Sequence, residues 1–507
     1  MSEENNNINI NETETEESSI STEDISEQSR IRQEKLAELT ERGENPFLIT
    51  KYETNSSAGA IIADFDAMEQ ENANVRIAGR IMARRDMGKA NFINIADFTG
   101  NIQVYVRSND IGEEKFAQFK KWDIGDIVGI SGKVFRTKRG EMSVHADSID
   151  LLSKALIPLP EKFHGLKDIE TRYRKRYLDL IMDSELKAMF IKKQVFWSTV
   201  RNFLSEKGFL EVETPILEIT SGGAAATPFK THHNALDIDV FLRISMGELW
   251  QKKLLVAGFD KTFEIGRQFR NEGMSNEHLQ DYTQMECYWA YADCNDGMNL
   301  VKEMYRRITK AVTGGSKFIS HGFEIDMDSE WEIYDFEDII KSKLGIGIYD
   351  TTIDAVKAKL NELDVDYDPK LNFWRLIDVL WKVVRKDLPG PGFLVGQPVQ
   401  LNPLPKRRKD DPRKVDQIQV IIAGSELGNG YAELNDPLDL EARFKEQRTL
   451  GEAGDTEAHH HDTDFVEALR YGMPPAFGFG VSERLFSFMM DKSIRECVLF
   501  PLMKPRD

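Results

Sequence analysis

Hydrophobic and polar residues alternate from residue 75 to residue 149, which is the pattern of half-buried β-strands. Turn signals at Thr99-Gly100 and Arg139-Gly140 interrupt the alternation, and a helical segment over 111–121 separates the third strand from the fourth. Five strands with a helix at this position predict a small closed barrel. The predicted strands are Val75–Arg84, Asn91–Phe98, Asn101–Arg107, Ile127–Phe135 and Met142–Ile149.

After residue 183 the hydrophobic period becomes helical. Phe196, Val200 and Phe203 recur at spacings of four and three, which predicts a long amphipathic helix over 184–207 that ends at Gly208. Strand-like segments follow at 209–214, 262–270 and 282–291, and again at 416–425 and 478–484. Strands and helices are therefore grouped rather than alternating, which favours an α+β fold over a parallel doubly wound sheet.

Composition divides the 507 residues into three parts. Residues 1–28 hold nine acidic side chains and no Lys or Arg, which predicts a disordered acidic tail. Residues 29–155 are expected to form a short helix, from Ile31 to Gly43, and an OB-fold barrel, whose face and loops bind oligonucleotides. Residues 156–507 are expected to form a second domain, with a helical insertion at about 316–409.

Several classes of protein are excluded by composition. No run approaches the roughly 18 apolar residues of a membrane span, and the N-terminus lacks the pattern of a signal peptide. The three cysteines form no CxxC pair, and the histidines at 459–461 lack partners nearby, so neither a disulfide framework nor a zinc site is predicted. We therefore expect a cytoplasmic protein with no membrane partner.

Basic residues gather on the first predicted strand and the loop after it, against the net charge of −19 of the whole chain. An aromatic ring that stacks on a base and an amide that reads a base edge are the means by which proteins recognise single-stranded RNA. From these residues alone, an equal alternative to RNA binding is that the aromatic ring belongs to the core and the arginines are solvated. The four candidates for RNA binding are Arg84, Arg85, Phe92 and Gln103.

Two strand-like segments of the second domain place an arginine beside a carboxylate, at Arg270-Asn271-Glu272 and at Glu483-Arg484. The planar fork of arginine matches phosphate oxygens, so two arginines at opposite ends of a triphosphate would hold it for attack on the central phosphorus. Phosphoryl and nucleotidyl transfer need mainly positioning and charge neutralisation, which arginines and a magnesium ion supply.

The segment 424–436 combines glycines with carboxylates, an amide and a phenol. Strict alternation would place Glu426 on one side of a strand and Asn429, Tyr431 and Glu433 on the other, separating a metal face from a substrate face. An exposed hairpin is the alternative for this segment taken alone.

Three segments in order resemble the motifs of the class II lysyl-tRNA synthetases of the bacterial type. Residues 203–215 (FLSEKGFLEVETP) resemble motif 1, residues 269–291 motif 2 and residues 478–484 (GFGVSER) motif 3. The resemblance runs from about Lys35 to Pro505. It implies an antiparallel sheet ringed by helices, a homodimer formed through motif 1, and an OB barrel that reads the anticodon. The implied activity is ATP-dependent formation of lysyl-adenylate from L-lysine and transfer of lysine to tRNA(Lys).

The resemblance also implies how ATP is held. Arg270 would grip the α-phosphate and the lysine carboxylate, and Arg484 would hold the γ-phosphate. Glu272 and Tyr282 would seat the adenine, with His278 near the phosphates.

For lysine, the resemblance implies a pocket with several carboxylates. Glu433 and Tyr288 would bind the ε-ammonium group, and Glu248 the α-ammonium group. Because an aspartate-specific relative would need a basic residue facing its substrate, the absence of one from this set favours lysine. The remaining residues that match the family's pocket are Glu286, Asn429 and Tyr431.

Departures from the family pattern mark a divergent branch. Glu426 would bind Mg²⁺, but Gln419 stands where the family usually supplies a second magnesium carboxylate. Glu277 replaces the usual arginine of the motif 2 loop, Met246-Gly247 adds a residue before Glu248, and motif 3 is one residue shorter than usual. Two alternatives therefore remain: a relative that charges another amino acid or lysylates a protein, and a non-catalytic RNA-binding paralogue.

Overall fold

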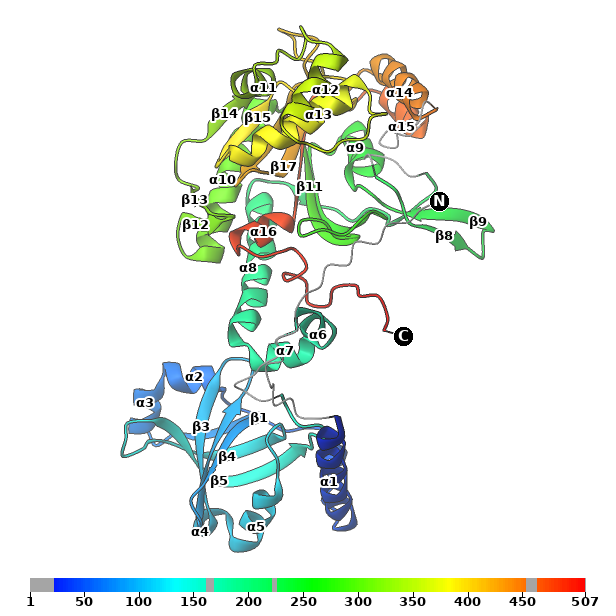
Figure 1. The fold of residues 1–507 in the computed structure, drawn as a ribbon. Helices are drawn as coiled ribbons and strands as arrows, with labels where there is room; N and C mark the ends of the chain where they lie inside the picture. The colour runs from blue at the N-terminus through cyan, green and yellow to red at the C-terminus, as the bar shows by residue number, and fades with distance from the viewer. Residues whose placement is uncertain (1–21, 161–167, 221–225, 453–462, 507) are drawn as a thin grey trace, which may run out of the picture. The chain divides into compact units, whose positions relative to one another are not determined.

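The computed structural model describes residues 22–160, 168–220, 226–452 and 463–506 (Figure 1). The chain divides into two compact units, Met1–Lys167 and Asp168–Asp507. Most of the predicted acidic tail and the histidines at 459–461 lie outside the described residues. Within the described ranges, no helix has both the length and the apolar character that crossing a bilayer requires.

The first unit contains a closed barrel of five strands in the order β1-β2-β3-β5-β4, which confirms the predicted OB-fold (Figure 1). Only β3 and β5 pair in parallel; the other neighbours are antiparallel. Alternate side chains, such as Ile77, Ile93 and Val104, fill the interior. The strands are β1 (Asn74–Asp86), β2 (Ala90–Ala96), β3 (Asn101–Arg107), β4 (Ile127–Arg136) and β5 (Met142–Ser153). The helices are α1 (Thr22–Glu41), η1 (Pro46–Leu48), α2 (Ala58–Ala63), α3 (Phe65–Gln70), α4 (Ser108–Ile111) and α5 (Glu113–Lys121).

Helix α1 begins at Thr22, inside the segment predicted to be disordered, and not near Ile31 as expected. Its later turns are anchored to the rest of the unit. Arg32 donates hydrogen bonds to the carbonyl of Ala155 at 3.0 Å, and Lys35 forms an ion pair with Asp123 at 2.7 Å. Because extending a helix costs far less than nucleating it, these tertiary anchors allow the polar first turns to become helical.

The second unit is built on an eight-stranded sheet in the order β14-β15-β16-β17-β18-β11-β10-β6. Pairing is antiparallel except between β14 and β15 and between β10 and β6, which confirms the predicted α+β class. The strands are β6 (Leu210–Glu211), β10 (Lys261–Phe269), β11 (Asp281–Ala290), β14 (Glu332–Asp335), β15 (Gly392–Val395), β16 (Gln417–Ile422), β17 (Ser425–Ala432) and β18 (Ala476–Ser482).

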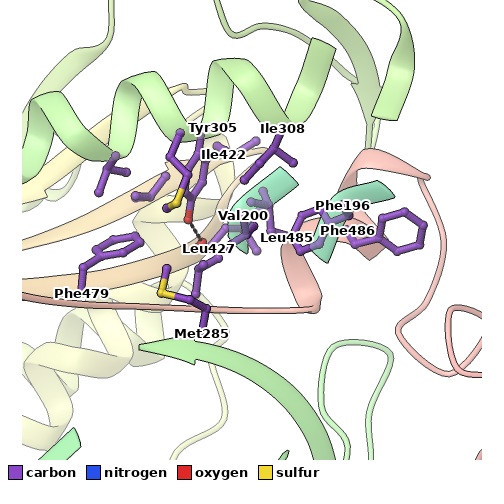
Figure 2. Close-up of a cluster of buried hydrophobic side chains, with 14 of the residues drawn as sticks. Phe196, Val200, Met285, Tyr305, Ile308, Ile422, Leu427, Phe479, Leu485 and Phe486 are labelled. Carbon is purple, nitrogen blue, oxygen red and sulfur yellow. Dashed lines mark hydrogen bonds between the residues drawn. The ribbon is translucent and has the colours of Figure 1, made fainter. Parts of the chain in front are cut away.

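One face of this sheet is covered by α8 (Ser184–Glu206) and α10 (Cys294–Thr313), which contribute to the largest hydrophobic core. Figure 2 shows Phe196 and Val200 of α8 near Leu485 and Phe486, and Tyr305 of α10 near Phe479. Asp183 caps the start of α8 by accepting hydrogen bonds from backbone amides.

Shorter elements complete the second unit. Its other helices are α6 (Ile169–Arg174), α7 (Arg176–Met182), η2 (Gly247–Gln251), α9 (Lys252–Val256), α11 (Phe336–Leu344), α12 (Ile353–Glu362), α13 (Phe373–Val384), η3 (Arg385–Asp387), α14 (Pro437–Glu452), α15 (Thr463–Arg470) and α16 (Arg484–Met489). Its two small sheets are formed by β7 (Leu217–Glu218), β8 (Lys230–His233) and β9 (Ile238–Leu242), and by β12 (Lys317–Ser320) and β13 (Phe323–Asp326).

The region expected to be a helical insertion is only partly helical. Helices α11, α12 and α13 surround a core of their own that includes Phe336, Leu380 and Trp381. However, β14 and β15 from the same region are strands of the central sheet, and β12 and β13 form a separate hairpin. Each of these strands spans four residues, too few to establish a two-residue period beside strongly helical neighbours.

Candidate functional site

A cavity of about 570 Å³ lies on the face of the central sheet away from α10. Its volume is within the range of about 300–1,000 Å³ that is typical of small-molecule sites. The cavity brings together side chains from β11, β16, β17 and β18, from several loops, from α11 and α13, and from the start of α16. The predicted site residues among its walls are Arg270, Glu272, His278, Tyr282, Glu286, Tyr288, Gln419, Glu426, Asn429, Tyr431, Glu433 and Arg484.

Strand alternation explains how β11 and β18 build the floor of the cavity. On β11, Met285 and Cys287 enter the core beneath the sheet, so Glu286 and Tyr288 face the cavity. Gly478 of β18 lies opposite Tyr288. A Cβ atom at Gly478 would lie 2.1 Å from Oε1 of Glu433, so only glycine leaves room for that carboxylate.

A β-bulge corrects the prediction that Glu426 and Asn429 face opposite sides of β17. The pairing passes from Gln419 opposite Asn429 to Ile421 opposite Glu426, which adds one residue to β17. Leu427 packs in the core, where its carbonyl accepts a hydrogen bond from Tyr305 at 2.5 Å (Figure 2). A Cβ atom at Gly428 would meet the same Tyr305 hydroxyl, so two successive residues face the core. Glu426 and Asn429 consequently both line the cavity.

Two arginines mark one part of the cavity. Arg270 follows β10, and its guanidinium lies 5.8 Å from the ring centroid of Tyr282. Arg484 begins α16 and forms an ion pair with Glu277 of the loop between β10 and β11. The Nε atoms of both arginines are buried and have no hydrogen-bond partner among the described residues. Both guanidinium groups therefore retain a donor that the described residues do not use.

The loop between β10 and β11 positions two more predicted residues. Burial, with the neighbouring Arg484 guanidinium, lowers the pKa of His278, and its Nδ1 lies 2.8 Å from the hydroxyl of Ser275. The Glu272 side chain accepts a hydrogen bond from the Thr227 amide at 3.3 Å. Burial raises the pKa of Tyr282, whose hydroxyl donates to Gln268 at 3.4 Å. The histidine is thus neutral at pH 7, and the tyrosine keeps its proton.

Another part of the cavity is acidic. Glu286 is 6% exposed, and its Oε1 atom accepts hydrogen bonds from the side-chain amides of Gln268, at 2.7 Å, and Gln284, at 2.8 Å. The Tyr288 hydroxyl donates to its Oε2 atom at 3.4 Å. These donors satisfy the buried carboxylate and fix its orientation.

Lys252, which sequence reasoning missed, is the ion-pair partner of a residue that lines this cavity. Its ammonium group forms an ion pair with Glu433, and both residues are almost completely buried. The ammonium group also lies 5.3 Å from the ring centroid of Tyr431. Lys252 and Lys253 are adjacent in the sequence, and only the packing of α9 against the sheet reveals that Lys252 is the buried one.

The segment expected to carry an additional residue before Glu248 is helical. Residues Gly247–Gln251 form η2, a single π-helical turn that leads into α9. Inserting one residue into a helix commonly produces such a turn, frequently at functional sites. Glu248 lies in η2, but its side chain is outside the described part of the chain.

The candidate metal ligands lie on β16 and β17. Oε1 of Glu426 accepts a hydrogen bond from the Trp381 indole at 2.6 Å. Oε1 of Gln419 accepts one from the side-chain amide of Gln397 at 3.3 Å. Among the residues that the structure describes, no group of three or more His, Cys, Asp and Glu side chains could hold a metal ion alone. This donor set fits a cation that takes most of its ligands from a bound phosphate and water.

In the barrel unit, Arg84 has a different environment from the one expected. Its guanidinium donates hydrogen bonds to the carbonyls of Phe119, Lys120 and Trp122 at 2.9–3.1 Å. Burial lowers its pKa. Carbonyl groups at the C-terminus of α5 lack helical partners, and Arg84 satisfies them. The RNA-binding role expected for Arg84 is therefore replaced by a role in holding α5 against the barrel.

The other predicted RNA-binding residues remain accessible. Phe92 is half-buried outside the barrel core, which rules out the core alternative, and its ring centroid lies 4.8 Å from that of Tyr105. Arg85 is exposed and pairs with Phe92 across β1 and β2. Gln103 accepts a hydrogen bond from Ser143 at 3.0 Å. Two further rings that the sequence analysis did not select, Phe135 and His145, continue this aromatic strip.

Comparisons with known proteins cover both units. A family model described as class II tRNA synthetases (D, K and N) matches residues 168–504, and one described as an OB-fold nucleic acid binding domain matches residues 75–152. The lysine–tRNA ligase of Pelotomaculum thermopropionicum is 46% identical over 491 residues, which cover 96% of each chain. That of Staphylococcus saprophyticus is 42% identical over 497 residues, covering 96% of this chain and 100% of the relative. That of Carboxydothermus hydrogenoformans is 42% identical over 491 residues, with 96% and 99% coverage.

Proposed function

The chain belongs to the class II tRNA synthetases, and within them to the lysine–tRNA ligases; from this premise we propose how its residues activate L-lysine with ATP and charge tRNA(Lys). The observation that supports the assignment of residues most is the single cavity shared by Arg270, Arg484 and the acidic group around Glu286 and Glu433. ATP–pyrophosphate exchange measured with each amino acid in turn tests the function. Exchange with lysine is expected, and its absence would favour a non-catalytic RNA-binding protein.

The first reaction joins lysine to the nucleotide. An oxygen of the lysine carboxylate attacks the α-phosphorus in line, the bond to the bridging oxygen breaks, and pyrophosphate leaves with its electrons. Arg270 is assigned to the α-phosphate and Arg484 to the γ-phosphate. Negative charge grows on the α-phosphate oxygens in the transition state, so a preorganised guanidinium stabilises it more than the ground state. The enzyme needs no covalent nucleophile for this step.

The adenine and the phosphates are held by the motif 2 loop. We assign the adenine to Glu272 and Tyr282, and the region of the phosphates to His278. A neutral His278 can donate one hydrogen bond to a phosphate oxygen without adding charge. Its lowered pKa is consistent with this role.

Selection of lysine follows from charge. The substrate has two ammonium groups, so its pocket needs more than one carboxylate. We assign the ε-ammonium group to Glu433 and Tyr288, and the α-ammonium group to Glu248. The further pocket residues that we propose are Glu286, Asn429 and Tyr431. In the second reaction, the terminal ribose hydroxyl of tRNA attacks the activated carbonyl, and AMP leaves.

We assign Mg²⁺ to Glu426 and Gln419. When bound, the ion neutralises phosphate oxygens of ATP and orients them. The Trp381 indole fixes Oε1 of Glu426, which orients the carboxylate before a metal arrives.

Restoring a carboxylate at 419 tests the metal assignment. Gln419→Glu is expected to lower the free Mg²⁺ concentration for half-maximal exchange by about tenfold, because a carboxylate binds the ion more strongly than an amide. Mg²⁺ is titrated at saturating ATP and lysine. Gln400→Glu, at an exposed position outside the cavity, is the charge-matched control. An unchanged or higher Mg²⁺ requirement in Gln419→Glu would remove residue 419 from the metal site.

The barrel is proposed to read the anticodon through Arg85, Phe92 and Gln103. Phe92→Ala is expected to raise the KM for tRNA(Lys) about tenfold, because base–aromatic stacking contributes about 1–3 kcal/mol. Lysine-dependent pyrophosphate exchange should be unchanged. Phe98→Ala removes a 71% exposed ring from the same unit and serves as the control. Loss of exchange in Phe92→Ala would contradict the assignment.

We also propose that the enzyme is a homodimer in the cytoplasm. Motif 1 contains the short edge strand β6, and apolar side chains are exposed in motif 1 and just after it, including Leu210 at 50%, Leu217 at 49% and Ile219 at 74%. Exposed apolar groups beside an unpaired strand edge are typical of a protein interface. The three cysteines are free and buried, which suits a reducing compartment.

A further inference from the structure

Glu277 places a carboxylate on the guanidinium that we assign to the γ-phosphate. The Glu277 and Arg484 side chains form a direct ion pair and are 31% and 17% exposed, respectively. Oε2 of Glu277 also accepts a hydrogen bond from the Ser425 hydroxyl at 3.4 Å. Ser425 precedes Glu426, so this contact connects the motif 2 loop to the strand that carries the proposed metal ligand.

The surroundings of Arg484 require an anion. Burial lowers the pKa of Arg484, and the nearby Arg385 guanidinium lowers it further, whereas Glu277 raises it. Arg385 is itself held by the Gly424 carbonyl, at 2.6 Å from its Nη1 atom. Two guanidinium groups repel each other in a partly buried site unless negative charge lies beside them. In the nucleotide-free enzyme, Glu277 supplies that charge in direct contact with Arg484, and Glu426 adds negative charge 3.9 Å from Arg385.

We propose that Glu277 sets the affinity for ATP, because its carboxylate occupies Arg484 until the γ-phosphate replaces it. This inference rests on the proposed function, in which Arg484 holds that phosphate. Carboxylate and phosphate oxygens both fit the fork of arginine, so one anion can exchange for the other. The exchange keeps Arg484 neutralised in both states, and it makes ATP compete with a group of the enzyme.

The exchange also involves the loop that holds the nucleotide. Glu277 lies between Glu272 and His278, and all three residues line the cavity. While Glu277 is paired, the loop between β10 and β11 is fastened to the start of α16. The displaced Glu277 carboxylate and the triphosphate repel each other, so they cannot both lie beside Arg484. ATP binding therefore releases this fastening and lets the loop rearrange around the nucleotide.

The experiment compares ATP binding to the full-length wild-type chain and to Glu277→Gln by calorimetry, with Mg²⁺ present. Glutamine keeps the shape of the side chain but removes its charge. The variant is expected to bind ATP about tenfold more tightly, because ATP no longer displaces a charged competitor. Its affinity for lysine should be unchanged. Asp281→Asn is the matched control, since Asp281 carries the same charge at the end of the same loop but pairs with Arg267.

Thermal unfolding provides a readout independent of catalysis. Without ATP, Glu277→Gln should have a lower Tm than the wild type, since it leaves Arg484 without its ion-pair partner. Saturating ATP should raise the Tm of the variant by more than it raises that of the wild type. Equal ATP affinities would overturn the proposal, because Glu277 would then be a structural partner only. Weaker ATP binding by the variant would also overturn it, since Glu277 would then assist ATP or its metal.

The proposed function and the proposed role of Glu277 can fail independently of each other. If the wild type shows no lysine-dependent pyrophosphate exchange, the enzymatic assignment fails whatever the ATP affinities are. If the wild type exchanges normally and the affinities are equal, only the role of Glu277 fails. In an Arg484→Ala background the difference between Glu and Gln at position 277 should shrink, because only the repulsion from the triphosphate remains, and an undiminished difference would overturn the proposal.

Discussion

Arg270→Ala is expected to lower kcat/KM for lysine-dependent pyrophosphate exchange by about a thousandfold. The guanidinium lies in the cavity beside Tyr282, and we assign it to the phosphate at which the bond forms and breaks. Its loss removes a contact that strengthens as charge develops, so the effect should fall mainly on kcat. Arg270→Lys keeps the charge but not the planar fork, and should recover only part of the rate.

Arg267→Ala is the control for this experiment. Arg267 lies three residues earlier, on β10, but it pairs with Asp281 and does not line the cavity. Its activity should be close to that of the wild type. A large rise in the KM for ATP with an unchanged kcat in Arg270→Ala would contradict the transition-state role, since that pattern indicates equal binding of ground and transition states.

The second large effect is expected at the buried pair of Glu433 and Lys252. Glu433→Gln should raise the KM for lysine about a hundredfold, because the ε-ammonium group loses its carboxylate. It should also lower the free energy of unfolding by about 3 kcal/mol, since the Lys252 ammonium is left buried without its partner. Exchange kinetics measure the first effect, and denaturant unfolding measures the second.

A double variant separates the two roles of Glu433. In Lys252→Met with Glu433→Gln, no charge of the pair remains buried, so much of the lost stability should return. Lysine activation should stay impaired, because the carboxylate for the substrate is still absent. If the double variant regained both stability and activation, Glu433 would serve the fold alone, and the ε-ammonium group would need another partner.

The pairing of β16 with β17 shows what the residue pattern of a single strand cannot predict. Regular alternation along a strand at 424–436 would separate Glu426 from Asn429. The additional residue in β17 becomes visible only when the partner strand is present, because a bulge is a property of a pair of strands. The residues that we assign to the metal and to the substrate share one cavity for this reason.

Long-range partners explain the remaining differences. Arg84 appeared in the sequence as a free cation, yet the carbonyls that it satisfies belong to α5, more than thirty positions away. The pairs of Lys252 with Glu433 and of Glu277 with Arg484 join segments even further apart. The charge of a residue in the sequence does not reveal such partners, because it gives neither the distance to a partner nor the burial of the side chain.

By itself, the sequence determined the OB barrel, the α+β class and the family, since alternation, caps and motif order depend on residues close together in the chain. Tertiary structure decided which charges meet in the cavity and which are used to hold the fold. The physical reason is that a charged side chain interacts over a few ångströms in space, and only the packing of strands and helices sets those distances.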